Sequence, residues 1–142
     1  MSAKVLVLNG PNIGQLGTRE PGIYGPDTYA DLVAACTAEG LELNLEVEVR
    51  QTDDEATYLA WLHGAEAAGL ILNPGAWTHT SVAVRDAAAQ LQVPFVEVHL
   101  SNPLAREAFR HTSYTAGLAA GLIAGFGLDS YRLALRALRK RL

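Results

Sequence analysis

The stretch KVLVLN at residues 4–9 is a short apolar run that ends in an asparagine. Consecutive Val and Leu residues without polar alternation are typical of a strand buried on both faces of a parallel sheet. Similar runs at 70–73 and 94–99 predict two more buried strands, and the alternating run at 43–49 predicts a half-buried one. The glycine-containing run at 121–126 is the expected fifth strand.

Longer segments between these strands predict helices. Thr28 and Asp31 approximate a capping box at the start of the first helix, and Gly40 and Gly69 are expected to end the first two. The expected helices span 28–39, 54–68, from 80 or 81 to about 91, and 130–142, with a short one at 105–110. Alternating strands and helices predict an α/β fold with helices on both faces of the sheet. Five strands favour a flavodoxin-like, doubly wound parallel sheet of order 2-1-3-4-5.

Length and composition restrict the class of protein. The chain has 142 residues and a mass of 15.2 kDa, which fits one compact domain. A net charge of −4 argues against a general nucleic-acid binder. The sequence contains no run of about 18 apolar residues, so we expect no membrane span. The apolar stretch near the N-terminus is too short for an export signal. Cys36 has no second cysteine with which to pair, so we expect a cytoplasmic protein.

Polar residues accumulate directly after three of the predicted strands. These runs are NGPN at 9–12, NPG at 73–75 followed by THTS at 78–81, and HLSN at 99–102. In the expected order the three strands are neighbours, and their carboxyl ends meet at the edge where doubly wound sheets bind ligands. We therefore predict a polar small-molecule pocket at this edge. Each run taken alone is also typical of a turn.

The segment 10–27 is long for a connection in a small domain, which is typical of a lid or a binding loop. It contains Arg19, Glu20 and Tyr24. An unperturbed tyrosine has a pKa of about 10, and a nearby guanidinium favours the phenolate. Arg19 and Tyr24 could thus form an activated base, and an exposed arginine with a tyrosine packed under the loop is the alternative.

Several catalytic motifs are absent from the sequence. There is no GxGxxG, no GK[ST] and no GxSxG. The only lysines are Lys4 and Lys140, which argues against imine chemistry. The absence of CxxC and HExxH argues against a structural zinc site.

Four stretches together resemble the type II 3-dehydroquinate dehydratases. They are LNGPNIGQLGTREPGIYG at 8–25, ILNPGAWTHTSVAVRDA at 71–87, FVEVHLSNPLAREAFRHTSY at 95–114 and GLIAGFGLDSYRLALRAL at 121–138. The resemblance implies a single dehydroquinase domain over 1–142 with a lid at about 10–27. It implies a hydro-lyase of the shikimate pathway that removes water from 3-dehydroquinate by anti elimination through an enolate, giving 3-dehydroshikimate. No metal or cofactor is implied, and the implied assembly is a homo-oligomer, a dodecamer built from trimers.

The resemblance also implies roles for single residues. Tyr24 is implied as the base that removes the hydrogen α to the ketone, with Arg19 holding it as phenolate. Asn12 is implied to stabilise the enolate through a water, and His99 to protonate the departing hydroxyl. Glu97, two residues before His99 and on the same strand face, is implied to orient it.

Further residues are implied to bind the substrate. They are the backbone N–H groups of Leu100 and Ser101 with the Ser101 hydroxyl and Asn73 for the carboxylate, His79 and Arg110 for ring hydroxyls, and Asp86 for a neighbouring subunit's site. As alternatives, Asp86 and Glu97 are ordinary ion-pair partners and Arg110 is a helix-end cation.

The sequence departs from the family pattern at a few positions outside the implied catalytic residues. Gly14-Gln15 replace Asn-Leu, Trp77 replaces Tyr, and Asp53 and Ala56 replace Asn and Gly. We interpret the segment 51–56 as more concerned with subunit contact than with chemistry. The competing hypothesis for the whole chain is a non-catalytic flavodoxin-like module that binds a small anion or a flavin.

Overall fold

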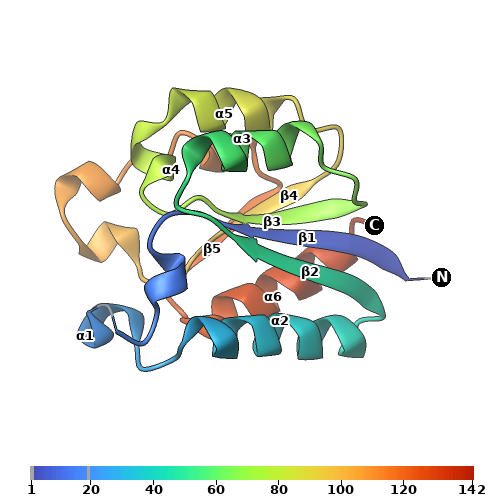
Figure 1. The fold of residues 1–142 in the computed structure, drawn as a ribbon, viewed down its shortest axis with the longest axis horizontal. Coiled ribbons are helices and arrows are strands. Elements are labelled where there is room, and N and C mark those ends of the chain that lie inside the picture. The colour runs from blue at the N-terminus through green and yellow to red at the C-terminus, as the bar shows by residue number, and fades with distance from the viewer. Residues whose placement is uncertain (1, 19) are drawn as a thin grey trace.

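The computed structural model describes residues 2–18 and 20–142, without the side chains of Pro21 and Tyr24. Five parallel strands form one sheet in the order β2-β1-β3-β4-β5, which confirms the predicted topology (Figure 1). The strands are β1 (Ala3–Asn9), β2 (Leu45–Gln51), β3 (Gly69–Asn73), β4 (Phe95–His99) and β5 (Gly121–Ala124). In this register Asn9 lies opposite Gln51 on one side and Asn73 on the other, so three amide side chains end neighbouring strands at one level.

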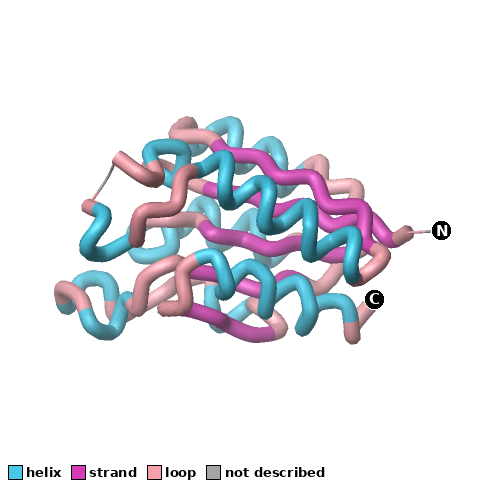
Figure 2. Tube along the Cα trace, turned by 90° about the horizontal axis from the view of Figure 1, so that it is seen from below, coloured by secondary structure: helices cyan, strands magenta, loops and turns pink. Residues whose placement is uncertain are grey.

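Helices cover both faces of the sheet. Figure 1 shows α3 and α5 on one face and α2 and α6 on the other, and Figure 2 shows the last two side by side. The helices are α1 (Pro21–Tyr24), α2 (Tyr29–Glu42), α3 (Glu55–His63), α4 (Trp77–Thr80), α5 (Val82–Ala89) and α6 (Leu128–Arg139). None of the helices in the described part of the chain has the length and apolarity needed to cross a membrane.

The alternation of side chains along β1 divides the core into two halves. Val5 and Val7 pack with α2 and α6, whereas Leu6 and Leu8 pack with α3 and α5. All four residues are at most 1% exposed. The run KVLVLN is therefore apolar throughout because both of its faces are covered.

The helix starts follow the predicted caps. The Thr28 side chain accepts a hydrogen bond from the N–H of Asp31, and the Asp31 carboxylate accepts one from the N–H of Thr28, which is the expected capping box. Ser81 has extended backbone and its hydroxyl caps α5. Because Ser81 leaves the helical conformation, the predicted helix beginning at 80 or 81 is preceded by a separate turn of helix, α4.

Both predicted glycine stops are wrong. The helix α2 continues through Gly40 to Glu42, and α3 ends at His63. A Cβ at Gly40 would lie 2.5 Å from Cγ2 of Val47, and one at Gly69 would lie 3.1 Å from Cδ1 of Leu138. These two glycines permit close packing between helix and sheet, and neither ends a helix.

Two segments differ in local structure from the prediction. The segment 10–27 includes the 3₁₀ helix η1 (Ile13–Gln15) as well as α1. The predicted helix at 105–110 consists of two 3₁₀ turns, η2 (Pro103–Ala105) and η3 (Ala108–Arg110). Figure 1 shows α1, α4 and the chain that follows β4 gathered at the carboxyl edge of the sheet.

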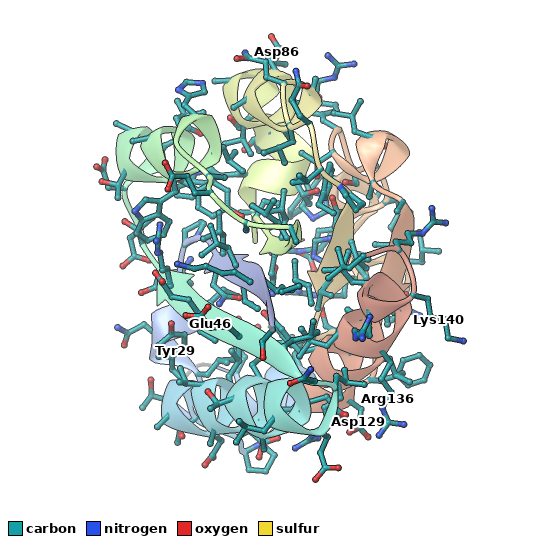
Figure 3. The ribbon with its side chains drawn as sticks, turned by 90° about the vertical axis from the view of Figure 1, so that its right-hand side faces the viewer. Tyr29, Glu46, Asp86, Asp129, Arg136 and Lys140 are labelled. Atoms are coloured by element: carbon teal, nitrogen blue, oxygen red, sulfur yellow. The ribbon has the colours of Figure 1, made fainter. Side chains whose placement is uncertain are left out.

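The terminal helix α6 is fastened to α2 by charged groups. Arg136 lies 3.2 Å from the carboxylate of Glu39, and the side chain of Arg139 donates to the carbonyl of Leu43. Arg136 projects from α6 at the surface in Figure 3. This contact anchors the helix that carries Tyr131 beneath the site described next.

Candidate active site

A cleft lies at the carboxyl edge of the sheet. Its walls come from the residues that follow β1, β3 and β4, as predicted from the three polar runs. Of the residues implied to act in the site, seven line the cleft: Asn12, Asn73, His79, His99, Leu100, Ser101 and Arg110.

A buried carboxylate–histidine pair lies at the cleft floor. His99 Nε2 lies 2.8 Å from Glu97 Oε2, and both residues belong to β4. Glu97 is completely buried and His99 is 8% exposed. Side chains two residues apart on a strand point to the same side, so the sequence spacing predicts this contact correctly.

Three hydroxyl groups complete the surroundings of Glu97. The hydroxyls of Thr78 and Ser113 donate to Oε2 at 3.1 and 2.7 Å, and that of Thr115 donates to Oε1. Burial raises the pKa of Glu97, but the hydrogen bonds from His99, Thr115 and Ser113 outweigh it and hold the pKa below its usual range. Glu97 is therefore a carboxylate at neutral pH.

The ionised Glu97 sets the role of each His99 nitrogen. A carboxylate only accepts hydrogen bonds, so Nε2 carries a hydrogen and donates a hydrogen bond to Oε2. The other nitrogen, Nδ1, is then the one left for a ligand. A histidine held in position by a buried carboxylate is an arrangement suited to a general acid.

His79 is oriented in the same way by a backbone carbonyl. Its Nδ1 lies 2.7 Å from the carbonyl oxygen of Thr112, which only accepts, so Nδ1 carries the hydrogen. Burial lowers the pKa of His79, and repulsion from His99 and Arg110 lowers it further against the opposing bond to Thr112. His79 is therefore neutral at pH 7 and presents Nε2 as an acceptor for a hydroxyl group. The rings of His79 and His99 are stacked, with centroids 6.2 Å apart.

Two guanidinium groups also line the cleft, those of Arg106 and Arg110. Arg106 Nη1 donates to the Ser101 hydroxyl at 3.3 Å, and Glu107 lies 3.8 Å from Arg106 and 3.0 Å from Arg110. Two arginines and one carboxylate leave this part of the lining with a net positive charge, which suits an anionic group. The sequence prediction included Arg110 and missed Arg106, whose position between two 3₁₀ turns has no spacing signature.

The loop that carries Asn12 is held by residues of the segment 51–56. Asn12 has the left-handed backbone conformation (φ 69°), and its N–H donates to Asp53 Oδ1 at 2.8 Å. Gln51 Nε2 donates to the same oxygen at 3.2 Å and to the carbonyl of Gly10 at 3.1 Å. We name Gln51 and Asp53 the loop clamp. Residues of the segment 51–56 therefore contact the loop of Asn12 within the same subunit.

Other residues of interest lie away from the cleft or outside the described part of the chain. Asp86 is an exposed residue of α5 that pairs with Arg85 at 3.0 Å and points outward in Figure 3. Trp77 packs against the Tyr58 ring, with centroids 5.2 Å apart. Arg19 and the side chain of Tyr24 lie outside the described residues. The backbone next to Tyr24 lies near the site, since Gly22 and Gly25 line a hollow together with Ser101.

No group of three or more His, Cys, Asp or Glu side chains within residues 2–18 and 20–142 is placed to hold a metal ion. The hydroxyl groups of Thr78, Ser113 and Thr115 were missed as functional residues by sequence reasoning. They come from two segments, and only their contact with Glu97 in the fold connects them.

Fold and cleft together define a doubly wound α/β protein with a small-molecule site built around a carboxylate–histidine pair. The family model for "Dehydroquinase class II" matches residues 3–139. A "3-dehydroquinate dehydratase" of Salinispora tropica is 58% identical over 140 residues, covering 97% of this chain and 98% of the relative. A crystal structure of "type II dehydroquinase" from Propionibacterium acnes has a TM-score of 0.94 and 50% identity, covering 99% and 98% of the two chains. That from Butyrivibrio crossotus has a TM-score of 0.93 and 40% identity, covering 96% and 97%.

The chain belongs to the class II dehydroquinase family. The match covers nearly the whole chain and nearly the whole of each relative.

Proposed function

We propose that this protein is a type II 3-dehydroquinate dehydratase, a hydro-lyase that converts 3-dehydroquinate into 3-dehydroshikimate and water in the shikimate pathway. The observation that carries the proposal is the buried Glu97–His99 pair at the floor of a cleft whose lining is partly cationic, in a member of this family. The substrate has a carboxylate, a ketone and ring hydroxyls, which match the groups that line the cleft. The family does not favour the competing hypothesis of a non-catalytic flavin or anion module.

The elimination needs a base, a group that stabilises the enolate, and an acid. Tyr24, as a phenolate beside Arg19, removes the hydrogen α to the ketone, and the electron pair moves into the carbonyl to form an enolate. Asn12, through a water, stabilises the enolate oxygen. The enolate then collapses, the C–O bond to the leaving hydroxyl breaks, and protonated His99 supplies the proton that makes water. Glu97 stabilises the imidazolium before this transfer.

Binding groups place the ring between base and acid. The backbone N–H groups of Leu100 and Ser101, the Ser101 hydroxyl and Asn73 take the carboxylate. His79 accepts a hydrogen bond from a ring hydroxyl at Nε2, and Arg110 donates to another. The location of these residues on one cleft supports these roles.

The proposal extends to the assembly and the compartment. Asp86 points away from its own cleft, and we assign it to a neighbouring subunit's site in a dodecamer of trimers. We place the protein in the cytoplasm, and we expect the reaction to need neither a metal nor a cofactor.

An ultraviolet assay tests the proposal by following the conjugated enone of the product from 3-dehydroquinate, with EDTA present. We expect turnover by the wild type and a loss of about 10²–10⁴-fold in kcat for Tyr24→Phe, Arg19→Ala and His99→Ala, with unchanged circular dichroism. No turnover by the wild type would reject the function. Normal turnover in Tyr24→Phe would reject that residue as the base and leave the family assignment intact.

A further inference from the structure

A chain of buried hydrogen bonds runs beneath the cleft from β2 through α6 to β3. Asn9 Nδ2 donates to the carbonyl of Arg50 at 3.1 Å, and Tyr131 Oη donates to Asn9 Oδ1 at 2.6 Å. Asn73 Nδ2 donates to Tyr131 Oη at 2.7 Å, and Asn73 Oδ1 accepts from the N–H of Gly75 at 3.1 Å. Asn9 and Tyr131 are completely buried, and Asn73 is 2% exposed.

Backbone groups at the two ends of this chain fix its direction. The carbonyl of Arg50 only accepts and the N–H of Gly75 only donates, so both amides have one orientation in which all their bonds are made. Between them, the Tyr131 hydroxyl accepts from one amide and donates to the other. Burial raises the pKa of Tyr131 far above its usual value, despite the opposing bond from Asn73, so the hydroxyl keeps its proton. Replacing the hydroxyl by hydrogen removes both bonds.

The fixed orientation decides what Asn73 presents to a ligand. Its oxygen is turned toward Gly75, and one hydrogen of Nδ2 is used by Tyr131. The second hydrogen of Nδ2 is left for the cleft, which Asn73 lines. A turned amide would instead place an oxygen lone pair near the ligand, and this would repel a carboxylate.

We propose that Tyr131 is a positioning residue, whose hydroxyl holds the Asn73 amide with its N–H toward the cleft and so makes this point of the site a donor for the substrate carboxylate. The proposal rests on the function proposed above. It gives a role in binding to a residue of the terminal helix that is not among the residues implied to act in the site.

Matched tyrosine variants test the proposal. Tyr131→Phe removes one buried hydroxyl, and the control Tyr58→Phe removes another, which donates to the carbonyl of Leu8 at 2.9 Å on the other face of the sheet. Tyr131→Phe loses two buried hydrogen bonds and Tyr58→Phe loses one, so we expect both variants to be destabilised, Tyr131→Phe by more. Only Tyr131→Phe should raise KM for 3-dehydroquinate, by about 10-fold or more, with kcat changed much less. The reason is that the Asn73 N–H is no longer held toward the substrate carboxylate, so a hydrogen bond to a charged group is lost.

A second variant covers the case in which Tyr131→Phe does not fold. Asn9→Ala removes the acceptor of the Tyr131 proton and frees the phenol to turn, so we expect a smaller rise in KM in the same direction. Equal KM values in Tyr131→Phe, Tyr58→Phe and the wild type would overturn the positioning role, as would a fall in kcat alone. Absence of wild-type turnover would reject the proposed function instead, so the two failures are distinct.

Discussion

Replacement of Glu97 by glutamine separates the charge of the buried carboxylate from its shape. Glu97 accepts one bond from a ring nitrogen, at 2.8 Å, and three from hydroxyls. A glutamine oxygen at the place of Oε2 accepts the same bond from His99, and the Thr115 hydroxyl turns to accept from the new NH₂ group. The fold is therefore retained, and the negative charge beside the imidazole is lost.

The magnitude follows from the difference between charged and neutral hydrogen bonds. A bond to a charged group contributes about 1.5–3 kcal/mol, against about 1 kcal/mol for a neutral one. This stabilisation favours the imidazolium form of His99, which is the proton donor, so its loss makes that form less favourable by about 1–2 kcal/mol and leaves less of the enzyme able to deliver the proton. We expect kcat of Glu97→Gln to fall about 5- to 30-fold, with KM changed little.

Steady-state kinetics with 3-dehydroquinate measure this effect, and thermal unfolding reports on the fold. Glu48→Gln is the matched control. Glu48 lies on β2, outside the residues that line the cleft, and its carboxylate pairs with Lys4 at 3.1 Å. Its kcat should equal that of the wild type. If folded Glu97→Gln also turns over at the wild-type rate, Glu97 does not act through His99 and the reasoning is wrong.

Three further predictions concern stability and the loop clamp. Since the pKa of Glu97 is lower in the fold than its unfolded value of about 4.5, its stabilising contribution is full above that pH and is lost as the pH falls through the lower folded value. Urea unfolding from pH 7 to pH 3 should therefore show a steeper loss of stability for the wild type than for Glu97→Gln. Asp53→Ala should lower kcat more than Asp53→Asn, because an asparagine oxygen still accepts the N–H of Asn12, and equal kinetics for the two would exclude a role of the clamp. Gly40→Ala should destabilise the protein by about 1 kcal/mol, since overpacking costs about 1–3 kcal/mol and helix propensity returns at most about 1. The same change in a Val47→Ala background should cost less, because the contact with Cγ2 is gone while those at 3.2 Å with Leu45 O and the Cβ of residue 47 remain, and an equal cost in both would refute the close contact as its cause.

The strand order was predictable because five strands that alternate with helices favour the doubly wound order 2-1-3-4-5. The Glu97–His99 contact was predictable for a local reason, since a spacing of two on a strand fixes the side. Gly40 and Gly69 were misinterpreted because a glycine that ends a helix and one that permits close packing look identical in a sequence.

The remaining parts of the site depend on contacts between distant segments. Thr78 and Thr115 reach Glu97 from separate segments of the chain, and Tyr131 reaches Asn73 across 58 positions. No periodicity connects such positions, so their roles were not visible before the fold. The pairing of Arg19 with Tyr24 stays a prediction that the kinetic variants address.

The alignment of Asn9 between Gln51 and Asn73 has a consequence for how this protein can diverge. The strand that divides the apolar core is also the one whose last residue joins the hydrogen-bond chain under the cleft. Adding or deleting one residue within it would exchange the valines and leucines between the two halves and, in the same step, pull the amide out of line with its neighbours. Sequence drift in β1 is thus confined to substitutions of similar size, and changes of length are confined to segments outside this strand.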